Sequence, residues 1–193
     1  MDRVTFSFFC TFLVLTTLCA ELKLYPNLPV GEYKLKFKAA FTCNSSVDYL
    51  IRANLHLSRI SKTVTALTGN ITTQIPFDDS IHLNLNMAVL DKIGGWKDNA
   101  FVYDKSNACS TLKYLMGNVW KPFVNSMNIT NYSCPFNSGF YVMKAFDISL
   151  LQEANFPKQF FYGTYKLKTY YTDTNKNIVG CSIIVVEFLR PWE

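Results

Sequence analysis

The sequence predicts a mainly β protein, an antiparallel sandwich or cup with one short helix. Apolar and polar residues alternate along several stretches of strand length, which is typical of strands with one buried face. Turn-forming residues separate these stretches, and a single stretch has helical spacing. Alternating strands that are separated by turns indicate an all-β layered fold.

The first residues have the layout of a secretory signal peptide. Asp2 and Arg3 precede an apolar run over residues 4–18, and Ala20 offers a small residue for cleavage. The run is short for a membrane anchor, which needs about 20 apolar residues. We therefore expect a signal peptide over residues 1–20, with cleavage after Cys19 as the alternative, and a single domain over residues 21–193.

Four stretches show the alternation of half-buried strands: residues 33–41, 49–57, 81–89 and 165–171. In the first, apolar residues occupy one face and Lys34, Lys36 and Lys38 occupy the other. The residues predicted to face inward are Tyr33, Leu35, Phe37, Phe41, Tyr49, Ile51, Ala53, Leu55, Leu57, Ile81, Leu83, Leu85, Met87, Val89, Tyr165, Leu167 and Tyr171.

Three further strands are expected from composition. Residues 178–188 are apolar almost throughout and rich in β-branched side chains, which predicts a central strand covered on both faces for most of its length. Residues 172–177 before it have hairpin-turn chemistry. Another strand is predicted over residues 139–148 and a weaker one over roughly 62–73, whereas Gly94-Gly95 is interpreted as a turn before Trp96.

One helix of two to three turns is expected after Cys109. Its apolar residues fall at helical spacing, and Pro122 predicts that the regular helix ends or kinks just before it. The residues with that spacing are Leu112, Leu115, Met116, Val119 and Phe123.

The cysteines predict two disulfides. Cys10 and Cys19 lie in the predicted signal peptide, and the even number that remains is typical of a secreted chain. Four cysteines allow three pairings. We favour Cys109–Cys134, which closes a local loop, together with Cys43–Cys181, which joins an early strand to the last one.

Four N-glycosylation sequons point to the secretory route as well. Each is a weak motif alone, but behind a signal peptide they predict a secreted, extracellular glycoprotein. The acceptors are Asn44, Asn70, Asn128 and Asn131.

The net charge of +5 is dispersed along the chain. A protein that binds nucleic acid concentrates its Lys and Arg on one element, so nucleic acid is excluded as a partner. We interpret the positive charge as a contribution to solubility. Attraction to anionic membrane surfaces or acidic ligands is the less favoured interpretation.

No catalytic or metal motif is present. The nucleophile-elbow, phosphate-loop and zinc-protease patterns are absent. His56 and His82 each fall on the polar face of a predicted strand, although a zinc site needs three or four converging ligands. Asp78-Asp79 is typical of a solvated turn, and a glycosidase-type carboxylate pair has no specific support. We expect no enzyme, no metal and no cofactor.

Aromatic residues are the most informative feature. The chain has 16 Phe, 11 Tyr and 3 Trp, concentrated in its second half. Four aromatics fall in residues 156–162, between two predicted strands, where a surface loop is expected. Such a loop either exposes its rings or closes them over a cavity mouth. A cavity wall or a membrane contact explains the aromatic residues about as well as ordinary core packing does.

Several segments resemble an insect family of small secreted proteins that includes the chemosensory B proteins. The resemblance is carried by Cys109 at a helix start, by Cys134-Pro135-Phe136, and by Gly139-Phe140-Tyr141 at a strand start. The family is distantly similar to the ganglioside activator protein and, more loosely, to lipid-recognition (ML) domains. The likeness is specific mainly between Cys109 and Tyr171, and this chain has fewer cysteines than the ganglioside activator.

The resemblance implies an immunoglobulin-like or ML-like β-cup whose two sheets are splayed open to receive acyl chains. It implies no catalysis, and its insect members are linked to contact-pheromone perception. The family has no agreed ligand-binding residues, so the candidate residues come from the strand faces and the aromatic loop.

We therefore expect a secreted, non-enzymatic protein that binds a lipid or other apolar ligand between two sheets, with a membrane surface or a receptor as further contact. The alternative is a protein–protein interaction module with a filled core. A secreted hydrolase is least favoured. The candidate cavity and rim residues are Phe37, Leu55, Leu85, Trp120, Phe123, Phe140, Phe160, Phe161, Tyr165 and Leu167.

Overall fold

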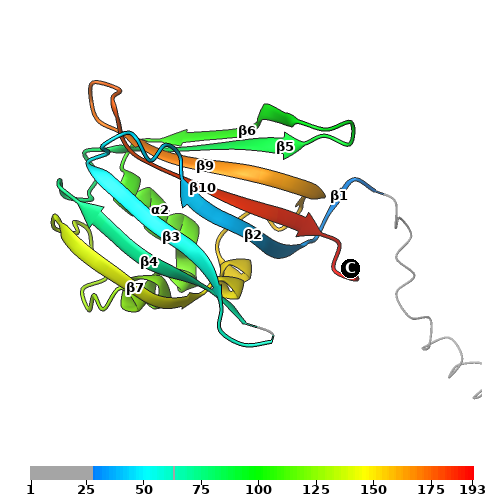
Figure 1. The fold of residues 1–193 in the computed structure, drawn as a ribbon, viewed down its shortest axis with the longest axis horizontal. Coiled ribbons are helices and arrows are strands. Elements are labelled where there is room, and N and C mark those ends of the chain that lie inside the picture. The colour runs from blue at the N-terminus through cyan, green and yellow to red at the C-terminus, as the bar shows by residue number, and fades with distance from the viewer. Residues whose placement is uncertain (1–27, 63) are drawn as a thin grey trace, which may run out of the picture.

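The computed structural model describes residues 28–62 and 64–193, so the predicted signal peptide lies outside the described residues. The chain is mainly β, as predicted, with short helices packed along one side (Figure 1). The strands are β1 Val30–Gly31, β2 Lys34–Thr42, β3 Ile51–Arg59, β4 Thr65–Thr73, β5 His82–Leu90, β6 Trp96–Lys105, β7 Gly139–Asp147, β8 Phe160–Phe161, β9 Gly163–Thr172 and β10 Ile178–Leu189.

The main sheet bends into two layers. Strands β6-β5-β9-β10-β2 pair antiparallel in one layer, which we call the large layer, and β3-β4-β7 form the small layer. A single parallel pair, Gly180 with Ile51, connects them. A Cβ at Gly180 would lie 2.9 Å from the Ile51 carbonyl oxygen, so the close approach at the bend requires glycine. The short strands β1 and β8 pair separately.

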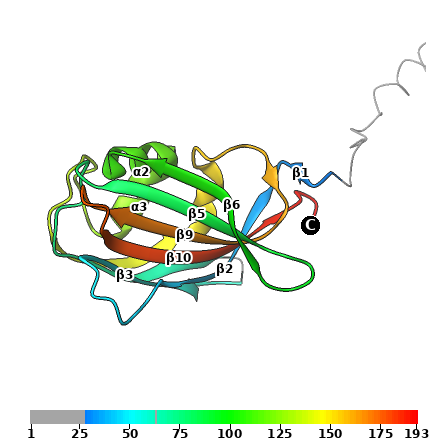
Figure 2. The ribbon, with the colours of Figure 1, turned by 90° about the horizontal axis from the view of Figure 1, so that it is seen from above.

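The helices lie together on one side of the strands (Figure 2). They are α2 Ala108–Met116, the 3₁₀ turn η1 Gly117–Val119, α3 Trp120–Ser126, and the 3₁₀ segment η2 Ile148–Glu153. α2 contacts β5 of the large layer, and α3 contacts β7 of the small layer. The helices therefore complete an enclosure whose other sides are the two layers.

The helical region differs from the single predicted helix. α2 ends before Gly117, whose φ of 54° is costly for a residue with a side chain, and α3 begins at Trp120. Pro122 lies in the first turn of α3, where the missing N–H has no partner to lose. The break between α2 and α3 is therefore caused by Gly117, and it lies earlier in the chain than the position predicted from Pro122.

Both favoured disulfides are confirmed. Cys109 of α2 bonds Cys134, and Cys43, next to β2, bonds Cys181 of β10. The first attaches the helices to the segment that leads into β7, and the second attaches β2 to the central strand.

Two predictions about strand faces are wrong. Phe41 is 45 % exposed and does not share a face with Phe37. The register with β10 shifts where Phe37 pairs with Val186 and Ala39 pairs with Val185, so Lys38 is an extra residue that reverses the alternation after it. β10 is central, as predicted, but it is covered on one face only. Its outward residues Ile183 and Val185 are half-buried rather than buried.

Strand β6 was not predicted. Its sequence lacks regular alternation, and nearly every residue in it is exposed because it forms the edge of the large layer. Asn99 within it has a φ of 60°, at a register irregularity between β5 and β6. Within the described ranges, no helix has the length and apolar character needed to cross a membrane.

Candidate apolar binding cavity

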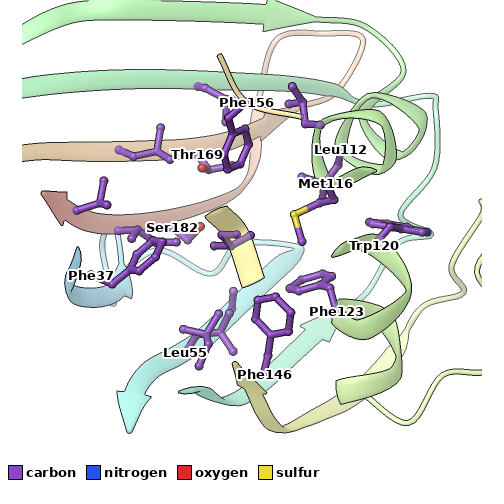
Figure 3. Close-up of a pocket in the computed structure, with 18 of the residues that line it drawn as sticks. Phe37, Leu55, Leu112, Met116, Trp120, Phe123, Phe146, Phe156, Thr169 and Ser182 are labelled. Atoms are coloured by element: carbon purple, nitrogen blue, oxygen red, sulfur yellow. The ribbon is translucent and has the colours of Figure 1, made fainter. Parts of the chain in front are cut away.

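A cavity of about 340 Å³ lies between the two layers and the helices. Its lining is contributed by both layers, α2, α3 and the segment before β8 (Figure 3). None of the described residues that line it carries a charged side chain. The cavity is therefore an apolar space into which few polar groups project.

The large layer forms one side of the cavity. Leu85 and Met87 of β5, Leu167 of β9, and Ile184 and Val186 of β10 line it. These residues lie two apart along their strands, so they share one face of the pleated layer. The intervening Lys166 and Lys168 of β9 fall on the opposite face, where Lys166 lies 5.1 Å from the ring centroid of Trp96. The strand alternation thus separates lysines from the cavity.

The small layer and α3 form the end of the cavity that we call the helix-covered end, defined by Trp120, Phe123, Val124 and Phe146. Trp120 stacks on Phe123 with ring centroids 6.2 Å apart, and Phe123 meets Phe146 edge-on at 5.3 Å. The indole Nε1 of Trp120 donates to the Tyr132 carbonyl oxygen at 2.9 Å. Because that N–H is already paired, the ring presents only apolar surface to the cavity.

The mouth of the cavity lies between β6 and the segment before β8, and we define it by Phe101, Phe156, Pro157 and Phe160. Phe101, at 36 %, and Pro157 are the exposed members of the lining. The rings of Phe101 and Phe160 meet edge-on with centroids 5.8 Å apart. The mouth is therefore bordered by aromatic rings from two separate parts of the chain.

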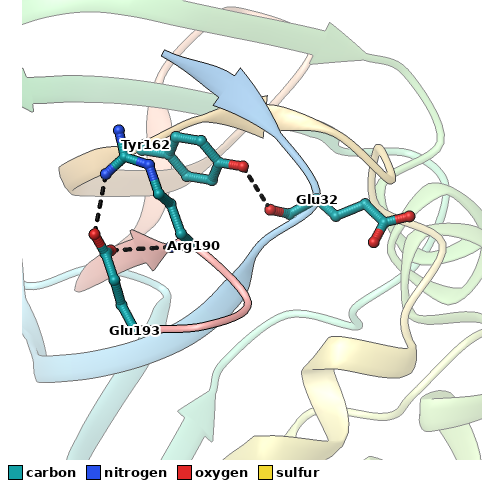
Figure 4. A network of polar contacts seen from close by, with 4 residues as sticks. All are labelled: Glu32, Tyr162, Arg190 and Glu193. Atoms are coloured by element: carbon teal, nitrogen blue, oxygen red, sulfur yellow. Dashed lines mark hydrogen bonds and ion pairs between the residues drawn. The ribbon is translucent and has the colours of Figure 1, made fainter. Parts of the chain in front are cut away.

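Polar contacts hold residues 156–162, which we call the mouth segment, in place (Figure 4). The Tyr162 hydroxyl donates to the Glu32 carbonyl oxygen at 2.9 Å, and the Arg190 guanidinium lies 4.7 Å from the Tyr162 ring centroid. Arg190 also pairs with Glu193 at 3.0 Å. The Tyr33 hydroxyl donates to the Pro157 carbonyl oxygen at 2.7 Å. The segment is thus attached to the link between β1 and β2 and to the residues that follow β10.

Most of the candidate residues lie in the cavity lining, and three do not. Tyr165 is not part of the lining. It is 5 % exposed and packs edge-on against the lining residue Phe188. Phe140 is 63 % exposed, because on β7 it alternates with the lining residue Tyr141. Phe161 is 58 % exposed because it follows the inward Phe160 in β8. The candidates that line the cavity are Phe37, Leu55, Leu85, Trp120, Phe123, Phe160 and Leu167.

Sequence reasoning missed several lining residues. Phe101 was missed together with β6. Thr169 lies between Leu167 and Tyr171, so the alternation of that strand identifies its face even though the residue is polar. Ser182 gives no such sign, because both faces of the last strand are apolar around it.

Tyr171 is the main titratable group of the cavity. Burial raises its pKa to about 12, and its ring lies edge-on to Phe77 with centroids 5.2 Å apart. Burial also raises the pKa of Tyr33 at the mouth side. Both shifts have the sign expected where the charged phenolate loses contact with water.

The predicted polar residues lie away from the cavity. His56 is exposed and shares a hydrogen bond with the Thr68 hydroxyl at 3.1 Å. Asp79 accepts hydrogen bonds from the backbone N–H of Ser110 at 2.8 Å and from its hydroxyl, so it stabilises the start of α2. Among the described residues, no cluster of His, Cys, Asp and Glu is suited to hold a metal ion.

Comparisons with known proteins add one family match. Residues 81–167 match a family model described as "Protein of unknown function (DUF1091)". No curated protein matches the chain. Among solved structures, the chain is similar to the crystal structure of chicken MD-1 complexed with lipid IVa, at 11 % identity and a TM-score of 0.29, over 82 % of this chain and 91 % of that one.

Proposed function

We propose that this protein is a secreted, non-catalytic binder of an apolar ligand such as a lipid or hydrocarbon. The single observation that supports the proposal is the cavity of about 340 Å³ whose lining carries no charge among the described residues. Removing apolar ligand surface from water contributes about 25 cal/mol per Å², or about 0.8 kcal/mol for each methylene group. Hydrocarbon alone therefore supplies useful affinity in such a space.

The size of the cavity favours a small ligand. Binding cavities for drug-sized molecules span about 300–1,000 Å³. At about 340 Å³ the cavity lies near the lower limit of that range. We therefore propose a ligand with one hydrocarbon chain or a compact ring system rather than a lipid with several chains.

Secretion is part of the proposal. Disulfides persist in oxidising compartments, and this chain holds two, one that closes a local loop and one that joins segments 138 residues apart. Asn44, Asn128 and Asn131 are exposed and Asn70 is half-buried on β4, which favours glycan addition at the three exposed sequons over Asn70. A role in chemosensory perception, implied by the resemblance alone, belongs to this proposal too.

The experiment that tests ligand binding uses N-phenylnaphthylamine, a neutral apolar dye whose fluorescence rises in dry surroundings. Protein stripped of bound lipid with organic solvent and refolded is titrated with the dye. We expect saturable binding at one site. Absence of dye uptake by folded protein would overturn the proposal.

A matched pair of variants locates the binding site. Ala53 lines the cavity, whereas Ala39 of β2 points away from it beside Val185. Ala53→Phe fills space that the dye needs, and we expect affinity to fall about tenfold, the equivalent of burying roughly two fewer methylene groups. Ala39→Phe adds the same ring outside the cavity and should leave affinity unchanged. Equal effects of the two variants would place the dye elsewhere.

A second candidate function is protein–protein binding through exposed apolar side chains. Phe161 beside the mouth is 58 % exposed, and Ile93 at the tip of the β5–β6 hairpin is 96 % exposed. Exposed apolar groups of this kind are typical of contact surfaces for a receptor or a membrane. This function requires no dye uptake, so the titration above separates the two candidates.

A further inference from the structure

Two small hydroxyl side chains lie side by side in the mostly apolar surface of the large layer. Thr169 of β9 pairs directly with Ser182 of β10, and both residues line the cavity. Side chains that are directly opposite on antiparallel strands have Cβ atoms about 4.5–5.5 Å apart. Figure 3 labels both residues on the neighbouring strands of the same surface. One ligand atom can therefore reach both hydroxyls.

Both hydroxyls are without a partner. Within residues 28–62 and 64–193, neither Thr169 nor Ser182 makes a side-chain hydrogen bond, and neither oxygen is sealed off from open space. The Tyr171 hydroxyl of β9 also has no hydrogen-bond partner among the described residues, whereas other polar groups of the lining are already occupied. Thr73 donates to the Ile75 carbonyl oxygen, and the Tyr141 hydroxyl donates to the Asn137 carbonyl oxygen at 2.6 Å. The Thr169–Ser182 pair is thus free to bind a ligand.

An entirely hydrocarbon ligand fits this pair poorly. It would remove both hydroxyls from water and return no hydrogen bond, which is unfavourable for any buried polar group. A ligand oxygen placed between them restores hydrogen bonds, because each hydroxyl both donates and accepts. The pair therefore favours a ligand that carries a polar group inside the cavity rather than only at its mouth.

That polar group must be neutral. No Lys, Arg or His is among the described residues that line the cavity, and Lys166 and Lys168 lie on the opposite face of β9 from Leu167 and Thr169. An ionised carboxylate or phosphate next to Thr169 would be buried without a counter-charge, at a large cost in free energy. A hydroxyl, carbonyl or ester oxygen has no such requirement.

We propose that the cavity selects an apolar molecule with one neutral oxygen group, which hydrogen-bonds Thr169 and Ser182 while the hydrocarbon remainder fills the surrounding space. The inference rests on the proposed function, because it names the ligand class for the same cavity. It divides the contacts into two kinds. Leu167, Ile184 and their neighbours supply affinity, and the hydroxyl pair supplies selectivity.

The test compares three ligands of equal chain length as competitors of bound N-phenylnaphthylamine: dodecane, dodecanol and dodecanoate, the last at a pH where it is fully ionised. We expect dodecanol to bind about tenfold more tightly than dodecane, as one or two hydrogen bonds provide. Dodecanoate should be the weakest. Equal affinity for dodecane and dodecanol, or binding of dodecanoate as tight as that of dodecanol, would overturn the inference.

Variants test whether Thr169 and Ser182 cause the preference for dodecanol over dodecane. Thr169→Val and Ser182→Ala together remove both hydroxyls with almost no change of shape, and we expect dodecanol to lose its advantage while dodecane binds at least as well as before. Thr164→Val on the outward face of β9 is the control and should keep the advantage. Persistence of the advantage in the double variant would overturn the inference, and thermal unfolding confirms that each variant is folded.

The outcomes separate the two proposals. If the dye does not bind to the folded protein, the proposed function and this inference fail together. If the dye and dodecane bind but dodecanol has no advantage, the protein is an apolar binder without the proposed selectivity.

Discussion

The two ends of the cavity are built differently. At the helix-covered end, Val124 is 0 % and Phe146 2 % exposed, and apolar packing alone holds them. At the mouth, Phe101 is 36 % exposed, and the neighbouring segment is held by hydrogen bonds from Tyr33 and Tyr162 to backbone carbonyls. One end is therefore stabilised by burial and the other by a few surface polar contacts.

This difference assigns separate roles to the two ends. Regions with few buried contacts open locally at lower free energy than the core does. Ligand entry and exit should therefore occur at the mouth, while the helix-covered end sets the shape and stability of the cavity. Three predictions test this comparison, in order of decreasing effect.

The largest effect is expected from truncating a ring at the helix-covered end. Phe146→Ala should lower the free energy of unfolding by about 3–5 kcal/mol, because it leaves a void in a fully buried cluster. Phe160→Ala at the mouth should cost roughly half as much, since its ring is only half-buried. Chemical denaturation measures both. Equal losses would contradict the distinction between the two ends.

The second effect is a loss of stability at alkaline pH that originates at Tyr171 of β9, which packs with Ile81, Leu83 and Ala108 away from the mouth. Burial raises the pKa of Tyr171 to about 12, whereas the unfolded chain titrates near the ordinary value of 10.0. Above pH 10 the unfolded state loses this proton while the folded state keeps it. Stability from this group is therefore complete below pH 10 and is lost as the pH rises towards 12.

Tyr171→Phe should flatten the dependence of unfolding free energy on pH across that window. The matched control is Tyr103→Phe on the edge strand β6, a residue outside the cavity lining. An unchanged slope in Tyr171→Phe would show that other groups cause the alkaline loss.

The smallest effect on stability is expected at the mouth. Tyr162→Phe removes the hydrogen bond to the Glu32 carbonyl oxygen but keeps the ring against Arg190, so it should cost about 1 kcal/mol. The dissociation rate of N-phenylnaphthylamine should nevertheless rise, because the mouth segment loses an attachment. Stopped-flow fluorescence measures that rate, and Tyr114→Phe, on the exposed side of α2, serves as the control. A rate unchanged in Tyr162→Phe would place the entry route elsewhere.

The strands could be predicted where alternation follows burial. β3, β5 and β9 alternate cleanly, so their inward residues, among them Leu55, Leu85 and Leu167, were identified from spacing. β6 was missed because an exposed edge strand has no buried face to impose a pattern. The bulge at Lys38 was missed for a related reason, since an extra residue in one strand is visible only once its partner is known.

The site was harder to predict than the fold. Choosing aromatic residues by type included Phe140 and Phe161, which lie on outward faces. It also omitted Thr169, although the alternation of β9 places it inward, and Ser182, whose neighbours in β10 are apolar on both faces. Sequence periodicity identifies faces, whereas only the pairing of strands shows which side chains share one cavity.

Native mass spectrometry of the protein secreted from insect cells tests most directly whether the cavity binds an apolar ligand during expression and secretion. We expect a mass excess over the glycosylated polypeptide that organic extraction removes and that matches a small, neutral, mainly apolar molecule with one oxygen group. The fraction of protein that carries this mass should be lower in the Ala53→Phe variant. A bare polypeptide mass that stays bare when the protein is incubated with dodecanol would contradict the account.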